Sequence, residues 1–502
     1  MESSTQSSVD SGLRKAWREL DGILWSSADL FRRAGLSPGQ HGPLFLGLFC
    51  LKYVLDAGVS SKLEPPIRRG MVSGRVPFPW QVGPDHSWPQ IISGRMDESL
   101  ADRILDTARD VEERNTAVAG VFTRGLLSGL RVLPPAELSQ LLLNATRVNF
   151  FDIFAEHPFG FAQWIDLRVS EIDRTIDPPP FLTGLVAALA SVEPARSITD
   201  PACGHGTLLV GTAIALAEYL DTEDGNSGAD FEIRGQEITA VGWALTRFRL
   251  CAHGFVEPAV EFGDTLRDPK LLTESGELAR TDLMICAPPW RRRLPETTGA
   301  DPWERFDYGA LARNASEAAF VHHAIACMPT KGGRAIIVLP RGFLSRGGGD
   351  AQLRQNLVDR GLLDAVFATS EGRKPLQWAV LVLDSREESR ARRETLFVDV
   401  PPTALESPDD HGAHRPLIKE LAEAAYQKRT SSNFFSASIA QDEIVSNAFM
   451  LDPRFYQPAT TTTRKSVDEL VRELEESSSE LSACTKSYDA ALSAAMKLLE
   501  KE

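Results

Sequence analysis

A turn of small and polar residues near the middle of the chain has the composition of a ligand-binding turn. It spans residues 200–207, reads DPACGHGT, and lies between an apolar run at 197–199 and an apolar helical segment at 207–220. In such a strand, turn and helix unit, backbone N–H groups face a ligand, and glycines let the backbone approach it closely. Glycine-rich turns also occur as plain connectors, but this context favours a nucleotide-type cofactor site. The candidate binding residues in the turn are Asp200, Ala202, Gly204, Gly206 and Thr207.

Polar residues also follow the next two predicted strands along the chain. Glu237 follows the run at 231–236, and Asp264 and Thr265 follow the run at 259–262. The carboxyl ends of neighbouring parallel strands meet at one edge of a sheet, where an acidic residue in dinucleotide-binding folds accepts hydrogen bonds from ribose hydroxyls. We expect Glu237 to take that role and Asp264 to accept from an adenine amino group of the cofactor. Each acid alone could be a solvated strand end, but the repeated placement favours one shared rim.

A proline-rich loop follows the predicted strand at 282–286. It reads Ala287-Pro288-Pro289-Trp290 and is similar to the catalytic tetrapeptide of amino-group methyltransferases. That tetrapeptide begins with asparagine, whereas this chain has alanine at the first position. The loop predicts chemistry at an adenine amino group, and Ala287 makes the activity of the site the main open question.

Three arginines follow this loop, and a pair of histidines lies further along the chain. The arginines could contact nucleic-acid phosphates beside the base entrance or could form a solvated loop. His322 and His323 lie on a predicted helix without a nearby Cys or acidic set at ligand spacing, so we expect a packed or surface pair and no metal site. The arginines are Arg291, Arg292 and Arg293.

The strands that must position these residues are apolar runs separated by helix-length segments between residues 171 and 384. This alternation indicates a βαβ series with a largely parallel, doubly wound sheet, and therefore an α/β fold. The expected strands are 197–199, 231–236, 259–262, 282–286, 333–339, 363–368 and 377–383. The charge-dense stretch 384–395 is expected to be a surface loop, and residues 396–457 give only weak signals.

The chain divides into three parts by pattern. Residues 1–168 predict a helical N-terminal domain because apolar residues recur at spacings of three and four, residues 169–395 carry the α/β pattern, and residues 396–502 form a C-terminal segment. In that last segment a capping box at 466–469 precedes apolar residues at helical spacing, which predicts a long amphipathic C-terminal helix. The helix either folds back on its own domain or docks onto a partner chain.

Composition limits the class of protein. The chain has 502 residues, of which 43% are hydrophobic, so it can bury a large core in two or three domains. The formal charge of −15 argues against a protein that grips DNA alone, because phosphate affinity comes mostly from clustered Lys and Arg. Six scattered cysteines suggest neither a zinc site nor a disulfide framework, and the longest apolar run, 43–55, is interrupted by Lys52. We therefore expect a soluble, cytoplasmic protein with no membrane contact.

Taken together, these motifs resemble the modification subunit of type I restriction-modification systems, a family of adenine-N6 DNA methyltransferases. The resemblance covers nearly the whole chain. It runs through the glycine turn and through GQEITAVGWALTRFRLCAHG, GDTL, DLMICAPPW and FVHHAIACMPTKGGRAIIVLPRGFLSRGG. It implies a Rossmann-like class I methyltransferase domain over residues 169–395 that binds S-adenosyl-L-methionine and accepts an adenine flipped out of the DNA stack.

The resemblance also implies roles for the proline-rich loop. In the family, the asparagine oxygen and the carbonyl of the first proline accept hydrogen bonds from the target amino group, and the aromatic residue stacks on the base. Pro288 and Trp290 match these positions, with Pro289 between them. Ala287 offers no side-chain acceptor, a loss that elsewhere costs on the order of a hundredfold in rate. A second departure is TIDP at 175–178, where the family has an aromatic-Tyr-Thr-Pro entry to the next helix.

The leading hypothesis is a DNA adenine-N6 methyltransferase subunit of a restriction-modification or related defence complex. Its expected partners are DNA, a specificity-type subunit bound through the C-terminal helix, and restriction or defence subunits. No recognisable target-recognition domain remains after the sheet, which fits a subunit that takes its specificity from another polypeptide. The alternative is a catalytically impaired, cofactor-binding scaffold or regulatory subunit, for which Ala287 is the distinguishing feature. Methylation of a protein glutamine or a small molecule is a third possibility, which the resemblance disfavours.

Overall fold

The computed structural model shows a mixed α/β protein. It describes residues 2–33, 35, 38–60, 75–94, 97–172, 178–224, 231–294, 301–368, 378–400, 415–430 and 434–457. Residues 1–455 form one compact unit and residues 456–502 a second, of which only residues 456 and 457 are described. The helix expected after residue 466 and the departure at 175–177 therefore lie outside the described residues. Within the described part, no helix is both long and apolar enough to cross a membrane.

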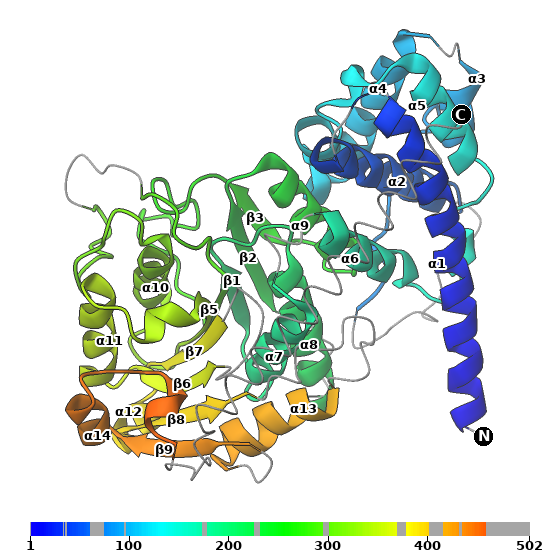
Figure 1. The fold of residues 1–502 in the computed structure, drawn as a ribbon. Coiled ribbons are helices and arrows are strands. Elements are labelled where there is room, and N and C mark those ends of the chain that lie inside the picture. The colour runs from blue at the N-terminus through cyan, green and yellow to red at the C-terminus, as the bar shows by residue number, and fades with distance from the viewer. Residues whose placement is uncertain are drawn as a thin grey trace, which may run out of the picture. The chain divides into compact units, whose positions relative to one another are not determined.

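A twisted central sheet organises the described part of the chain (Figure 1). Its nine strands follow the order β3-β2-β1-β4-β5-β7-β6-β8-β9. Neighbouring strands are parallel, except that β7 is antiparallel to β5 and β6, and β9 is antiparallel to β8. The strands are β1 (Ser197–Asp200), β2 (Glu232–Glu237), β3 (Ala259–Phe262), β4 (Leu283–Cys286), β5 (Arg334–Pro340), β6 (Leu363–Ala368), β7 (Trp378–Asp384), β8 (Glu394–Asp399) and β9 (Ser436–Ala440). The first seven lie within one residue of their expected positions.

Helices cover both faces of this sheet (Figure 1). On one face lie α7 (Pro180–Ala190), α8 (Thr207–Asp224) and α9 (Ala240–Ala252); on the other lie α10 (Ser316–Cys327) and α11 (Gly349–Asp359). Strands β4, β6 and β7 are buried along their whole length, which explains why their sequences are continuously apolar and do not alternate. Because crossovers between parallel strands are right-handed, the helices change face where the strand order reverses, between β1 and β4. Ligands bind at that switch point in folds of this class.

A helical region built from residues 2–172 packs against α9. Its aromatic core includes a stacked pair, Tyr53 and Phe161, with ring centroids 4.1 Å apart, and a second pair, Phe49 and Trp164, at 5.6 Å. Gly125 allows the close approach to α9, because a Cβ at this position would come within 2.3 Å of the Ala244 Cβ. The helices are α1 (Glu2–Arg33), α2 (Pro38–Ser60), α3 (Trp88–Ser93), α4 (Ser99–Arg114), α5 (Pro135–Ala145) and α6 (Gly160–Ile172).

Short elements connect these layers. The remaining helical segments are η1 (Thr116–Val118), η2 (Val121–Leu126), η3 (Leu130–Val132), η4 (Asp152–Phe154), η5 (Arg341–Leu344), α12 (Glu387–Arg392), α13 (Arg415–Lys419), η7 (Glu420–Gln427), α14 (Gln441–Ser446) and η8 (Pro453–Phe455). Segments η2 and η7 are π-helical. Strands β8 and β9 extend the sheet beyond the region where the sequence indicated strands, and the expected boundary at residue 395 falls within β8.

The stretch 384–395 is not the surface loop expected from its charge density. Asp384 is fully buried at the end of β7, residues 387–392 form α12, and β8 begins at residue 394. The charges are accommodated by ion pairs, since the Arg386 guanidinium donates from Nε to both oxygens of Asp384 at 3.0 Å. Arg392 likewise donates to the buried Asp364 of β6 at 2.8 Å. The stretch is therefore a strand end, a short helix and a strand start, with Asp384, Arg386 and Arg392 in ion pairs and most of its other charged residues exposed.

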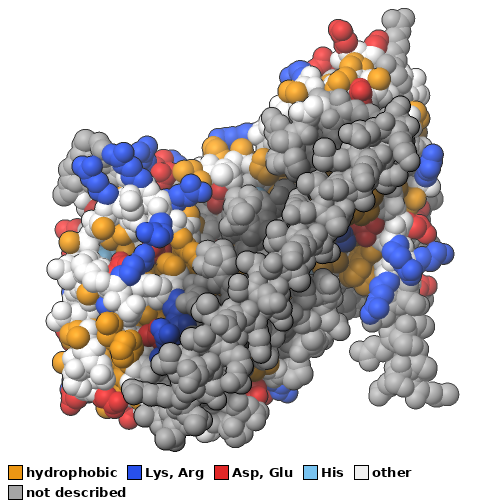
Figure 2. All heavy atoms as spheres, viewed as in Figure 1, with side chains coloured by type: hydrophobic (Ala, Val, Ile, Leu, Met, Phe, Trp, Pro, Cys, Tyr) orange, Lys and Arg blue, Asp and Glu red, His pale blue; other side chains and the backbone are white. Residues whose placement is uncertain are grey.

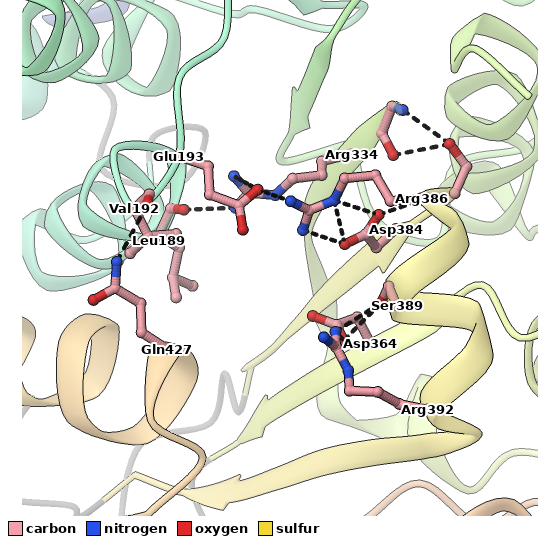
Figure 3. A network of polar contacts seen from close by, with 12 residues as sticks. Leu189, Val192, Glu193, Arg334, Asp364, Asp384, Arg386, Ser389, Arg392 and Gln427 are labelled. Atoms are coloured by element: carbon pink, nitrogen blue, oxygen red, sulfur yellow. Dashed lines mark hydrogen bonds and ion pairs between the residues drawn. The ribbon is translucent and has the colours of Figure 1, made fainter. Parts of the chain in front are cut away.

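Figure 3 shows these ion pairs, which lie at the carboxyl end of β7 and the amino end of β6. Glu193 lies between Arg334, whose Nη1 is 3.8 Å away, and Arg386, to which it is hydrogen-bonded. Arg334 also donates to the Leu189 carbonyl at 2.7 Å. A cavity of about 290 Å³ opens here, and it is lined by Glu193, Pro194, Ala195, Asp282, Leu283, Gly332, Arg334 and Arg386. Positive and negative side chains balance one another around it.

Candidate functional site

The turn after β1 has the backbone geometry that its glycines predict. Gly204 and Gly206 have φ values of +55° and +88°, in the left-handed region that favours glycine. A Cβ at Gly206 would come within 2.9 Å of the Thr246 hydroxyl on α9, so the turn also has no room for a side chain there. Thr246 donates to the Gly204 carbonyl at 3.0 Å. The turn is therefore pressed against α9 and held in one conformation.

The N-terminus of α8 opens from this turn. Its i to i−4 hydrogen bonding begins with Val210 N–H and the Gly206 carbonyl, at 2.8 Å. The first N–H groups of a helix have no partner within the helix, and the helix dipole makes this end partially positive. Thr207, the first residue of α8, lies at this end. Backbone donors are thus presented at the carboxyl edge of the sheet, as the sequence predicts.

Two buried carboxylates lie beside the turn. Asp200 is 1% exposed and Glu237 is 8% exposed. Asp200 accepts from Ala202 N–H at 3.0 Å, while Glu237 accepts from Gly204 N–H at 3.0 Å and from the backbone N–H of Thr239 at 2.8 Å. In the part of the chain that the structure describes, no Lys or Arg forms an ion pair with either acid. The site therefore concentrates negative charge that nothing in the described chain neutralises.

The pKa of Asp200 reflects this environment. Burial and, to a smaller extent, the negative charge of Glu237 raise it to about 7, against the lowering effect of the hydrogen bond from Ala202. Desolvation and a like charge both disfavour the ionised form of a carboxyl group. A ligand that carries positive charge would favour ionised Asp200 and relieve the repulsion between the two acids. The electrostatics of the site thus select for a cationic ligand.

The loop after β3 joins the same site, with different roles for its two candidate residues. Thr265 is buried, and its hydroxyl donates to the Pro201 carbonyl at 2.5 Å, so it fastens the loop to the glycine turn. Asp264 remains partly exposed, with 30% of its side chain accessible. One of its oxygens accepts from Leu266 N–H at 3.0 Å. The second oxygen lies 3.8 Å from the exposed Arg267, which leaves Asp264 able to face a ligand at the rim.

Arg305 supports this loop from behind, and the sequence did not indicate it. Its side chain is 2% exposed and donates to the carbonyls of Thr265 at 3.0 Å and Leu266 at 2.8 Å. Asp301 pairs with the same guanidinium at 2.8 Å. Burial and, to a smaller extent, the nearby charge of Arg305 lower the pKa of His323 to about 3, so His323 is neutral. The histidine pair is packed in the interior, one of the two placements expected for it.

The proline-rich loop begins directly after β4 and is held by the first residues of α10. The Ser316 hydroxyl donates to the Pro289 carbonyl at 2.6 Å, and the N–H of Arg291 donates to Glu317 at 2.8 Å. Glu317 is buried and also pairs with Arg346 at 2.8 Å. Arg291 has a φ of +54°, which is unusual for a residue other than glycine. The bonds to Ser316 and Glu317 offset that cost and fix the direction in which the loop leaves the sheet.

The chemical groups of this loop differ in accessibility. Pro288 is buried, Pro289 is exposed, and Ala287 and Trp290 are half-buried against the core. Among the described residues, none donates a hydrogen bond to the Pro288 carbonyl. Ala287 supplies no side-chain acceptor at the position after β4.

Positive charge lies next to the proline-rich loop. Arg291, Arg292 and Arg293 are all exposed. Figure 2 shows Lys and Arg side chains gathered over α10 and the loops next to it. Because β1 and β4 are neighbours, this loop and the glycine turn lie on either side of the switch point. The structure thus brings the two sequence motifs to one edge of the sheet. Within the described residues, no group of three or more His, Cys, Asp or Glu side chains is placed to hold a metal ion.

Curated relatives carry related sequences. The chain is 25% identical over 314 residues to the type I restriction enzyme MjaVII methylase subunit of Methanocaldococcus jannaschii, a match that covers 59% of this chain and 51% of the relative. It is 24% identical over 276 residues to the type I restriction enzyme MpnII methylase subunit of Mycoplasma pneumoniae, covering 51% of this chain and 48% of the relative. The chain thus spans about half the length of the curated relatives it matches.

Solved structures share the fold. The type I restriction-modification methyltransferase subunit of Streptococcus thermophilus superposes with a TM-score of 0.68 at 18% identity, covering 88% of this chain and 99% of that one. A chain from a study of assembly and conformational transition of the type I restriction-modification system gives a TM-score of 0.62 at 19% identity, covering 94% and 98%. These superpositions confirm a methyltransferase fold with a helical N-terminal region. The family described as N-6 DNA Methylase matches residues 178–465, more than half of the sequence, and the chain therefore belongs to that family.

Proposed function

We propose that this protein is a DNA adenine-N6 methyltransferase subunit of a restriction-modification or related defence complex, with S-adenosyl-L-methionine as its cofactor. The observation that carries the proposal is the pairing of two sites across the switch point. On one side is a glycine turn whose buried carboxylates form no ion pair within the described residues, and on the other is a Pro-Pro-Trp loop whose Pro288 carbonyl accepts no hydrogen bond from them. Membership of the N-6 DNA methylase family supports the same reading.

The residues of the glycine turn fit the cofactor. S-adenosyl-L-methionine, when bound, supplies a methyl group on a positively charged sulfur, so the negative charge of Asp200 and Glu237 favours it over neutral nucleosides. Glu237 would accept hydrogen bonds from ribose hydroxyls with lone pairs not used by Gly204 and Thr239. Ile238, next in the chain, is 59% exposed and offers an apolar surface for an adenine ring at the rim. Asp264 would accept from the amino group of that ring.

The proline-rich loop would hold the target base. An adenine that is to react must leave the DNA stack, and aromatic side chains stabilise such a base by stacking, worth about 1–3 kcal/mol per base. Trp290 supplies the aromatic face, and the Pro288 carbonyl accepts a hydrogen bond from the amino group that is methylated. Both groups orient the nitrogen for direct attack and form no covalent bond with the base. Ser316 and Glu317 keep the loop in position, as their hydrogen bonds show.

Ala287 favours a second candidate function, a catalytically impaired subunit retained for cofactor binding or assembly. The amino nitrogen gains positive charge as it attacks, and each preorganised acceptor directed at such charge contributes about 3 kcal/mol. This chain keeps the backbone acceptor of Pro288 and lacks the side-chain acceptor. We infer slow methylation rather than none, because the rest of the loop is intact.

The distribution of charge supports two further proposals, that the protein contacts DNA and that it acts together with partner subunits. The exposed arginines 291–293 would contact phosphates beside the flipped base, which positions DNA without reading its sequence. The net charge of −15 does not supply strong DNA affinity, so a specificity-type subunit would supply the rest of the contact and the sequence choice. The C-terminal helix expected after residue 466 is the proposed docking element. Restriction or defence subunits would complete the complex.

A methyl-transfer assay tests the proposal. The wild-type chain, Ala287→Asn and Trp290→Ala are incubated with tritiated cofactor and unmethylated DNA, with and without a type I specificity subunit. We expect weak transfer to adenine N6 by the wild type, roughly a hundredfold more by Ala287→Asn, and a loss of about tenfold or more by Trp290→Ala. Transfer by none of the three, while the cofactor still binds, would establish the scaffold function instead.

A further inference from the structure

A polar link connects the helical N-terminal region to the glycine turn. Asp166 on α6 accepts from Arg249 Nε at 2.8 Å and lies 2.8 Å from His253 Nε2. Arg249 and His253 belong to the end of α9 and its C-cap, and both are buried, with 3% and 2% exposure. The acid is separated from its partners by more than eighty residues, so the link forms only in the folded chain.

The far side of the Arg249 guanidinium reaches the turn itself. Its Nη1 donates to the His205 carbonyl at 2.6 Å and to the Thr207 hydroxyl at 3.3 Å. These two acceptors flank Gly206, whose left-handed φ of +88° sets the direction of the turn. A guanidinium is planar and rigid, so a carboxylate that holds one edge also fixes the other edge. Asp166 therefore determines where Arg249 places its donors.

The carboxylate of Asp166 and the guanidinium of Arg249 in this link carry opposite charges. Although burial raises the pKa of Asp166, its electrostatic interactions and hydrogen bonds with His253 and Arg249 lower it to about 2. Asp166 is ionised at neutral pH as a result. A second residue of the helical region, Arg75, donates to the His253 carbonyl at 3.2 Å and lies over the Phe159 ring at 4.9 Å. The helical region thus contacts the cluster at two points.

We infer that Arg249, held by Asp166, is a positioning residue for the cofactor turn, so that the helical N-terminal region contributes directly to cofactor affinity. The inference rests on the proposed function, in which this turn binds S-adenosyl-L-methionine. Thr246, Glu237 and Thr265 hold the first part of the turn, and Arg249 bonds both residues that flank Gly206. Preorganisation by Arg249 lowers the conformational cost of binding. Any partner that shifts α6 would then change cofactor affinity through this link.

Arg247 provides a matched control, two residues earlier on the same helix. It also joins α9 to the helical region, since it donates to the carbonyls of Ala117 at 2.9 Å and Thr116 at 3.3 Å. It packs on Trp243 and forms no hydrogen bond with residues 200–207 among those described. Loss of Arg247 should weaken docking of the helical region without altering the turn. The two arginines therefore separate a general structural role from a positioning role.

The test compares the full-length wild type with Arg249→Met, Arg249→Lys, Asp166→Asn and Arg247→Met. For each we would measure the Kd for S-adenosyl-L-methionine by calorimetry, the melting temperature, and hydrogen exchange of the peptide over residues 203–210 without cofactor. We expect Arg249→Met to weaken binding at least tenfold, with Arg249→Lys and Asp166→Asn intermediate, and all three to speed exchange in the turn. Arg247→Met should bind within twofold of wild type despite a lower melting temperature. Asp166→Asn is nearly isosteric and keeps the test possible if Arg249→Met does not fold.

Two different failures can be told apart. Equal affinity of the wild type and the Arg249 variants, or equal loss in Arg247→Met, with exchange in the turn unchanged, would overturn the positioning role. No binding by the wild type, together with faster exchange only in the Arg249 and Asp166 variants, would overturn the proposed cofactor function while leaving the positioning of the turn established.

Discussion

The two edges of the sheet differ in how their acidic side chains are paired. On the edge where β4 and β5 begin, Glu193 and Asp384 face Arg334 and Arg386 (Figure 3), and both acids have a cation beside them. At the edge where β1 and β2 end, the buried Asp200 and Glu237 take their hydrogen bonds from N–H and O–H groups and not from cations. In the first arrangement the charges are paired within the chain. In the second they are not paired within the described residues, and we propose that a cationic cofactor pairs with them.

This difference separates structure from function better than the size of a cavity does. The cavity of about 290 Å³ lies at the first edge, where both signs of charge are already balanced. Burial of an unpaired carboxylate is costly, and a fold keeps such a cost mainly at sites where binding recovers it. The edge that carries Asp200 and Glu237, which we call the unbalanced edge, also carries the glycine turn and the proline-rich loop.

Removal of a paired acid should have the largest effect, and on stability alone. Asp384→Ala leaves Arg386 without its main partner at the fully buried end of β7, so we expect a loss of about 3 kcal/mol in the free energy of unfolding. Urea denaturation measures it. Because the change is at the opposite edge, the folded variant should bind S-adenosyl-L-methionine with unchanged affinity. A large loss of affinity in the fully folded Asp384→Ala variant would show that the two edges are not independent.

Removal of an acid without a cation partner should lower cofactor affinity and leave stability nearly unchanged. Glu237→Gln keeps the size of the side chain and an acceptor for Gly204, but it places an NH2 group where an oxygen accepts from Thr239, and it removes one of the two negative charges. We expect cofactor affinity to fall by roughly a hundredfold, about 2.7 kcal/mol, while the free energy of unfolding changes little, because the relief of like-charge repulsion offsets the lost hydrogen bond from Thr239. Calorimetric titration and urea denaturation of the same sample check both halves. Lower stability with normal affinity would make Glu237 a structural residue.

A change of pH should have a smaller, graded effect on stability and on cofactor affinity. Asp200 has a pKa of about 7 in the folded protein, above its value of about 3.9 in an unfolded chain. Its contribution to stability therefore becomes less favourable as pH rises between these two values. Cofactor binding has the opposite sign, because a cation favours the ionised acid. Affinity should rise by on the order of tenfold from pH 5.5 to 7.0, below the range where the α-amino group of the cofactor titrates.

An Asp200→Asn variant is the control for that profile. It cannot ionise at this position, so its affinity should be nearly constant over the same pH range. The same slope in the variant and the wild type would assign the proton to another group.

The sequence predicted the strands best where burial on both faces imposes continuous apolar runs. Strands β4, β6 and β7 lie where those runs predict them, and β1, β2, β3 and β5 also lie within one residue of their predicted positions. The prediction failed at β9, whose SASIA sequence is short and suits an edge strand, and at α12, where Arg392 pairs with Asp364 of a distant strand. It could not indicate Arg305 or the link from Asp166 to Arg249. Neither lies in a sequence motif, and both depend on residues that only the folded chain brings together.

The most direct test of the unbalanced edge is calorimetric titration of the wild-type protein with S-adenosyl-L-methionine at pH 6.5, in two buffers with different enthalpies of ionisation. The account predicts binding at one site per chain, with release of a proton as Asp200 ionises, seen as a difference in heat between the two buffers. Absence of binding, or binding without proton release that survives Glu237→Gln unchanged, would contradict it.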